Sequence, residues 1–146
     1  MTSITYHRWF RVLLLYLVVV SWAFWMGGFS FYFGVVIRVG GEIVGDSSQG
    51  FITQGVTLWL NRIGLIALGV FLCQVWVSKN RWLALLWAAM AIEQGILMTL
   101  HRMLDRMLDG PNQAILDAAR FPVWHEWYEF NSAIQWLAAM VFIGIL

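Results

Sequence analysis

The sequence has far fewer charged residues than a water-soluble domain of its length. Of its 146 residues, 12% are charged and 61% are hydrophobic, whereas an average soluble domain carries about 25% charged residues. A soluble fold of this size could not bury that much apolar surface. The formal net charge is +1 and the basic residues form no cluster, which argues against a nucleic-acid partner. The composition therefore indicates a membrane protein.

Cysteine is scarce as well, and aromatic residues are in excess. The single cysteine, Cys73, lies within an apolar stretch, so it forms no internal disulfide and is expected to pack as a small hydrophobe. The ten Trp, ten Phe and four Tyr residues exceed ordinary usage. Membrane proteins place such rings at the boundary with water. We expect one domain covering residues 1–146.

Four stretches are long and apolar enough to cross a bilayer, which takes about 20 mainly apolar residues. They lie near Trp9–Ile37, Val56–Val77, Trp82–Leu104 and Trp124–Leu146. The first opens with basic residues like a signal peptide, but its apolar run is much longer than the roughly 7–15 residues of such peptides, so we expect it to remain as an anchor. The predicted fold is all-α, a polytopic membrane protein with a four-transmembrane-helix bundle.

The tryptophans support these boundaries. One predicted interface contains Trp9, Trp76 and Trp82, and the other contains Trp59, Trp124 and Trp127. Four more tryptophans lie deeper in the spans and are expected to pack between helices, namely Trp22, Trp25, Trp87 and Trp136.

The three connections differ in character. The link Ser78–Arg81 has four residues, so the helices on either side of it must be antiparallel neighbours. The link from Arg38 to Gly55 is rich in glycine, which favours a flexible connector over a binding loop. Tandem Arg-Met-Leu-Asp repeats at 102–109 predict an amphipathic extension of the third helix. Residues 112–120 predict a short helix before the last span.

The basic residues near the spans predict the orientation in a bacterial inner membrane. Four flank the spans on each side: Arg8, Arg11, Lys79 and Arg81 on one, and Arg38, Arg102, Arg106 and Arg120 on the other. The first set lies close to the spans and has no acidic residues among it, whereas the second is mixed with carboxylates. We therefore expect both termini in the cytoplasm.

Two ionisable residues fall inside predicted spans, Arg62 in the second and Glu93 near the middle of the third. A charge there costs roughly 2.5–3.5 kcal/mol on insertion scales. Because these helices form the short hairpin, Arg62 can reach Glu93 directly or through water, and Asn61 and Gln74 would complete a polar seam. Such a pair either fixes helix pairing or lines a proton or ion relay, and the sequence leaves both interpretations open.

A second candidate site lies at the outer boundary. His125 and Glu129 are one helical turn apart, in a variant of the H-E-x-x-H zinc pattern with Glu in the last place. The third span brings His101 to the same boundary. These three residues are candidate ligands of a transition metal, with Glu126 as a base beside the ion. Alternatively, the side chains are solvated or paired with nearby arginines.

Two motifs carry a family resemblance. The first is Trp-Met-Gly-Gly at 25–28, followed by Phe29, Phe31 and Val35-Val36, and the second runs from Trp124-His125 to Asn131-Ser-Ala-Ile-Gln-Trp136. With these motifs the chain resembles, over most of its length, an uncharacterised family of small bacterial four-helix membrane proteins. That resemblance implies the fold rather than an activity. A fainter resemblance to copper-resistance membrane domains implies metal handling.

The expected function is that of a non-enzymatic integral membrane subunit, or of an assembly element in a larger membrane complex. Intramembrane polarity is sparse and no nucleophile or cofactor motif is evident. Expected partners are the lipid bilayer and other membrane subunits or further copies of the chain, without nucleic acid. The alternative is a small transporter or metal-handling protein that uses Glu93, Arg62 and the outer His/Glu cluster. A membrane enzyme is the third possibility.

Overall fold

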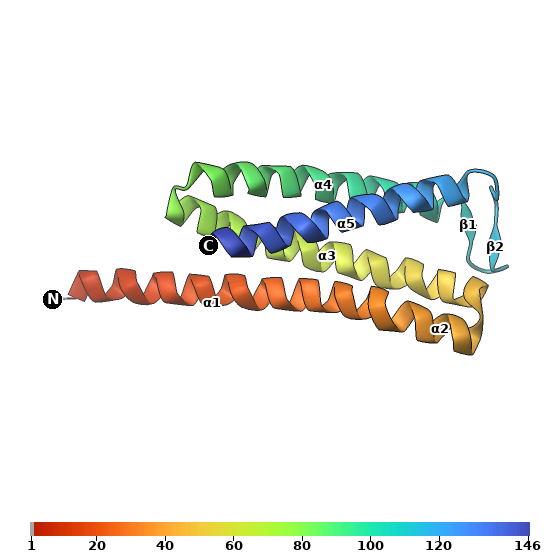
Figure 1. Ribbon diagram of the computed structural model, residues 1–146, viewed down its shortest axis with the longest axis horizontal. Coiled ribbons are helices and arrows are strands. Elements are labelled where there is room, and N and C mark those ends of the chain that lie inside the picture. The colour runs from red at the N-terminus through yellow and green to blue at the C-terminus, as the bar shows by residue number, and fades with distance from the viewer. Residues whose placement is uncertain (1) are drawn as a thin grey trace.

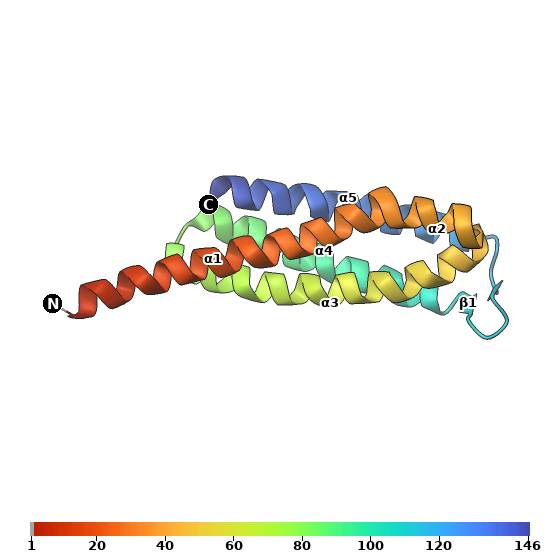
Figure 2. The ribbon, with the colours of Figure 1, turned by 90° about the horizontal axis from the view of Figure 1, so that it is seen from below.

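The computed structural model describes the backbone of residues 2–146 and the side chains of residues 8–45 and 48–146. Long helices run side by side along one axis (Figure 1). The helices are α1 (Thr2–Phe31), which continues through a π-helical turn (Tyr32–Val36) into α2 (Ile37–Val44), then α3 (Asp46–Ser78), α4 (Arg81–Asp105) and α5 (Phe121–Ile145). Figures 1 and 2 show both termini and the α3–α4 turn at one end of the bundle. The α2–α3 turn and a small hairpin lie at the other end.

Three helical stretches are long and apolar enough to cross a membrane within the described residues: Arg8–Val44, Ser48–Ser78 and Arg81–Asp105. The prediction of an all-α fold with these three stretches is confirmed. The fourth predicted span is also a helix, α5, with 25 residues. Its first half carries His125, Glu126 and Glu129, and α5 is not among these three stretches.

The α3–α4 link is the tight turn that the sequence predicts. Lys79 takes the left-handed conformation with φ of 53°, and the Asn80 side chain caps α4 by accepting a hydrogen bond from the Trp82 N–H at 2.9 Å. A short polar side chain in this position satisfies one of the free N–H groups at a helix start. The two helices are antiparallel neighbours, as predicted.

The prediction of a flexible connector from Arg38 to Gly55 is wrong, because this segment is helical except at one residue. Gly45 separates α2 from α3 with φ of 83° and ψ of 152°, a conformation that other residues rarely adopt. The other glycines of this segment keep helical geometry, which a glycine permits at a cost of about 0.5–1 kcal/mol. Tyr32 helps to hold the two arms together by donating a hydrogen bond to Thr53 Oγ1 at 3.0 Å.

The predictions for the α4–α5 connection are also wrong. α4 ends at Asp105, so the repeats do not extend it to residue 109, and the predicted short helix over residues 112–120 is absent from the described structure. Instead, β1 (Leu108–Asp109) pairs antiparallel with β2 (Ala114–Ile115). The turn forms because the Asp109 carboxylate accepts hydrogen bonds from the Asn112 backbone and side chain. Such side-chain bonds compete with helix formation.

The deeper tryptophans pack between helices, as predicted. The indole of Trp22 donates to the Ala139 carbonyl at 3.0 Å, joining α1 to α5. The indole of Trp87 donates to the Leu68 carbonyl at 2.9 Å, joining α4 to α3. At the centre of the core, the fully buried rings of Phe71 and Phe142 stack with centroids 4.6 Å apart.

At Gly64, side chains of α1 and α4 lie close against the backbone of α3. A Cβ atom at this position would lie 2.8 Å from Gln94 Oε1 and 2.9 Å from the Trp25 ring. Gly69, also on α3, has no atom within 4 Å of the corresponding position. The two glycines therefore differ in packing although they share a helix.

This difference predicts opposite effects of the same substitution. We expect Gly64→Ala to destabilise the protein by about 1–3 kcal/mol, as overpacked positions do. Gly69→Ala should be neutral or stabilise the helix by about 0.5–1 kcal/mol. Thermal unfolding of both variants in detergent measures the effect, and equal midpoints would contradict the close approach at Gly64.

Candidate functional site

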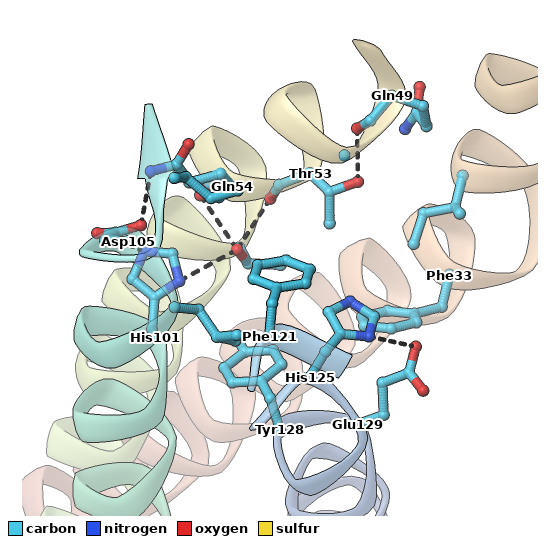
Figure 3. Close-up of a pocket in the computed structure, with 15 residues that line it drawn as sticks. Phe33, Gln49, Thr53, Gln54, His101, Asp105, Phe121, His125, Tyr128 and Glu129 are labelled. Atoms are coloured by element: carbon cyan, nitrogen blue, oxygen red, sulfur yellow. Dashed lines mark hydrogen bonds and ion pairs between the residues drawn. The ribbon is translucent and has the colours of Figure 1, made fainter. Parts of the chain in front are cut away.

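A cavity of about 330 Å³ opens at the end of the bundle that carries the hairpin (Figure 3). Its wall is formed by the π-helical turn and the start of α2, the first turns of α3, the end of α4 and the start of α5. Ligand pockets commonly have volumes of roughly 300–1,000 Å³. The cavity is therefore large enough for a small molecule.

One wall of the cavity holds the buried His101 of α4. Its Nδ1 lies 3.4 Å from Thr57 Oγ1, and its Nε2 lies 3.6 Å from Asp105 Oδ2. The Thr57 hydroxyl donates to the Thr53 carbonyl at 2.8 Å, and its oxygen accepts from His101 when Nδ1 carries the imidazole proton. Asp105 is held in turn by the Gln54 side chain, which donates to Oδ1 at 2.8 Å.

The other polar pair belongs to α5. His125 Nδ1 lies 3.6 Å from Glu129 Oε1, and the His125 ring stacks on Phe121 with centroids 5.8 Å apart. The helix begins with Pro122 in its first turn, where proline's missing N–H and fixed φ are well tolerated. This start places both side chains on the cavity wall (Figure 3).

The three predicted metal ligands, His101, His125 and Glu129, all line this cavity. They do not converge, however, because His101 pairs with Asp105 on α4 while His125 pairs with Glu129 on α5. Within the described residues, no group of three or more His, Cys, Asp or Glu side chains is arranged to hold a metal ion. The predicted base, Glu126, is exposed and is not part of the lining.

The sequence analysis missed Asp105 as a member of this site. It did contain a signal, because His101 and Asp105 have the same four-residue spacing on a helix as His125 and Glu129. Side chains at this spacing are neighbours on one helical face. The site thus contains two histidine–carboxylate pairs on different helices, of which the His101–Asp105 pair is the more buried.

Arg62 and Glu93 are not brought together. The Arg62 guanidinium lies over the Trp59 ring, 4.8 Å from its centroid, and the side chain is exposed. Glu93 Oε1 is buried and has no hydrogen-bond partner among the described residues. Successive residues on a helix point about 100° apart, and Gln94 takes the position that faces α3. This turns its neighbour Glu93 away from that helix.

A polar seam does cross the bundle, but it is made of neutral groups. The Asn61 amide donates to the Tyr128 hydroxyl at 3.1 Å, and Gln94 donates to Asn61 Oδ1 at 3.0 Å. Gln135 donates to Gln94 Oε1 at 3.3 Å and to the Met90 carbonyl at 3.1 Å. We refer to Tyr128, Asn61, Gln94 and Gln135 as the amide network. It begins at the inner end of the cavity, where Tyr128 is part of the lining.

Of the predicted seam, Asn61 belongs to this network, whereas Gln74 is buried further along α3. That position is thirteen residues from Asn61, or about 20 Å along the helix. Tyr128 and Gln135 were missed because α5 was not expected to contribute polar groups to the seam.

The amide network predicts a specific stability effect. Tyr128→Phe removes the acceptor of the Asn61 amide, and leaving a buried polar group without its partner costs about 1–3 kcal/mol. Tyr16→Phe is the matched control, because Tyr16 is 63% exposed. We expect a lower unfolding midpoint in detergent for the first variant alone. Equal midpoints would show that the bond contributes no stability.

The chain matches no protein-family model, no curated protein and no solved structure. The resemblance to a bacterial four-helix family therefore stays a prediction that rests on the two motifs. Function has to be inferred from the cavity and its surroundings.

Proposed function

We propose that the chain is an integral membrane protein of four spanning helices, a non-enzymatic subunit or assembly element that binds a small molecule at one membrane face. The cavity between the two histidine–carboxylate pairs carries this proposal. It combines apolar and aromatic walls with a few polar groups, which is the usual composition of small-molecule sites.

Exposed tryptophans support the placement in a bilayer. On α3, Trp59 and Trp76 are 62% and 76% exposed and lie seventeen residues apart, which corresponds to about 26 Å of helix. On α4, Trp82 lies twenty residues before Arg102, or about 30 Å. Both spacings are close to the thickness of a hydrocarbon core, about 30 Å. Interfacial tryptophans mark such boundaries.

The burial pattern of α5 supports a fourth span. Trp127 is 54% exposed and lies eighteen residues before Ile145, which corresponds to about 27 Å of helix. The polar residues between them, Asn131, Ser132 and Gln135, are buried in the bundle. Polar residues in spanning helices commonly face the bundle interior in this way.

An even number of spans agrees with the position of the termini at the same end as the α3–α4 turn (Figure 1). The basic residues near that end favour a cytoplasmic location for both termini in a bacterial inner membrane. Lipid, and other subunits or further copies of the chain, are the proposed partners of the apolar face of α1. Trp9, Leu13 and Tyr16 are among its exposed residues.

Binding accounts for the cavity better than transport or catalysis. The hydroxyls of Thr53 and Thr57 donate to backbone carbonyls one turn earlier in α3, so they are held in place rather than activated. At its inner end the cavity meets the amide network, which lines a second space of only about 10 Å³, enough for about one water molecule. Glu93, which a relay would use, lies eight residues from His101, or about 12 Å along α4.

The four-span arrangement predicts which residues are reachable from each side. In a Cys73→Ser background, Lys79→Cys and Leu146→Cys should react with an impermeant maleimide from one side of oriented vesicles, and Asn112→Cys from the other. Labelling of Leu146→Cys and Asn112→Cys from the same side would contradict the fourth span.

The cavity itself is tested with a matched pair of glycines on α3. Gly50 lines the cavity and Gly55 does not, and a Cβ atom added at either position would meet no atom within 4 Å. Gly50→Phe should occupy part of the cavity. We expect native mass spectrometry of the extracted protein to show a small-molecule adduct on the parent and on Gly55→Phe, and to show its loss from Gly50→Phe. An adduct that is unchanged in Gly50→Phe, or absent from the parent, would contradict the proposal.

A further inference from the structure

The His101 wall of the cavity places two hydrogen-bond acceptors next to each other. Thr57 Oγ1 uses its proton on the Thr53 carbonyl, so we assign to His101 the tautomer that donates from Nδ1 and keeps a lone pair on Nε2. That nitrogen is buried and has no hydrogen-bond partner among the described residues. It lies 3.6 Å from Asp105 Oδ2, and a carboxylate oxygen is also an acceptor. In this tautomer, neither His101 Nε2 nor Asp105 Oδ2 has a proton to donate to the other.

The charge of the lining shows which kind of donor fits. Asp105 and Glu129 each contribute a carboxylate, and none of the described lining residues is a lysine or an arginine. Apart from the two histidines, the charged side chains of the lining are these two carboxylates. Asp105 already accepts a hydrogen bond from Gln54 at its other oxygen, so Oδ2 is the oxygen left for a ligand. A cation with N–H groups satisfies both the charge and the missing donor.

The remaining wall is suited to an organic body. The side chains of Phe33, Phe121 and Tyr128 line the cavity together with Ile37 and Leu104. Aromatic faces attract cations within about 6 Å of the ring centre, and apolar side chains favour a carbon skeleton. The volume of about 330 Å³ is far more than a single metal ion requires. The two histidine–carboxylate pairs also lie on separate helices (Figure 3).

We propose that this cavity binds a small organic ammonium ion that keeps at least one N–H group and carries an aromatic or apolar body. Its N–H groups bridge His101 Nε2 and Asp105 Oδ2, Glu129 adds negative potential from α5, and the body lies against the aromatic side chains. This assignment rests on the proposed function, because it presumes that the cavity is a ligand site.

Three probes of similar shape separate the contributions. The full chain in detergent is titrated by calorimetry at neutral pH with 2-phenylethylammonium, with its N-trimethyl derivative and with 2-phenylethanol. The trimethyl derivative keeps the charge but has no N–H, and the alcohol has no charge. We expect saturable binding of the ammonium ion. Affinity should fall roughly tenfold or more for the trimethyl derivative, the loss expected for a charged hydrogen bond, and the alcohol should give no saturable heat.

Matched variants then locate the ion. Asp105→Asn removes the charge but keeps an oxygen that can accept from Gln54, and it should weaken binding of 2-phenylethylammonium roughly tenfold or more. Glu129→Gln should have a smaller effect. Glu126→Gln, on the same helix but outside the lining, should leave the affinity unchanged. Unfolding midpoints of the variants control for loss of structure.

Three results would overturn the proposal: no binding of the ammonium ion to the parent protein, equal affinity for the ammonium ion and the alcohol, or equal effects of Asp105→Asn and Glu126→Gln. The proposed function is judged separately. If the adduct still disappears in Gly50→Phe, the cavity remains a ligand site for a different class of molecule. If the ammonium ion does not bind and the adduct is also unchanged in Gly50→Phe, both proposals fail.

Discussion

The Gln94 amide joins three helices near the middle of the bundle, donating to Asn61 on α3 and accepting from Gln135 on α5. In a bilayer no water replaces these partners, so a buried amide has to find them within the protein. Hydrogen bonds of this kind contribute about 0.6–2 kcal/mol each between membrane helices. They also require close approach, which Gly64 permits by leaving room for the Gln94 side chain. The network therefore fixes how α3, α4 and α5 are aligned along the bundle axis.

That alignment determines the geometry of the cavity. On α4, His101 lies two turns beyond Gln94, and on the antiparallel α3, Thr57 lies about one turn beyond Asn61 in the same direction. The two side chains consequently meet, with Nδ1 3.4 Å from Oγ1. Tyr128 belongs to both units, because it accepts from Asn61 and lines the cavity. A shift of one helix by a single turn would separate His101 from Thr57 and leave the amides without partners.

Helix positions could be predicted from the sequence more completely than the connections or the site. Apolar runs and the short Ser78–Arg81 link are local features, and they gave the long helices and the tight turn. The glycines from residue 40 to 55 were read as flexibility, but φ values decide the outcome, and Gly45 alone leaves the helical region there. For the site, the positions of His101 and His125 in the sequence correctly predicted that both lie at the same end of the bundle. Whether the two histidines converge depends on how α4 is rotated about its axis relative to α5. The same rotation decides that the side chain of Gln94, rather than that of Glu93, points into the bundle.

Unequal helix lengths explain why a cavity exists at this end. α3 has 33 residues and continues for thirteen residues before Trp59, about 20 Å past the level of that ring, together with α2. α4 stops at Asp105 and α5 starts at Phe121. The polar ends of these two helices therefore line the cavity together with the apolar side chains of Phe33 and Ile37. A cavity that combines charged and apolar side chains in this way suits an amphipathic ligand. Because the cavity lies at the end of the bundle, a ligand would reach it from that end without crossing the hydrophobic core.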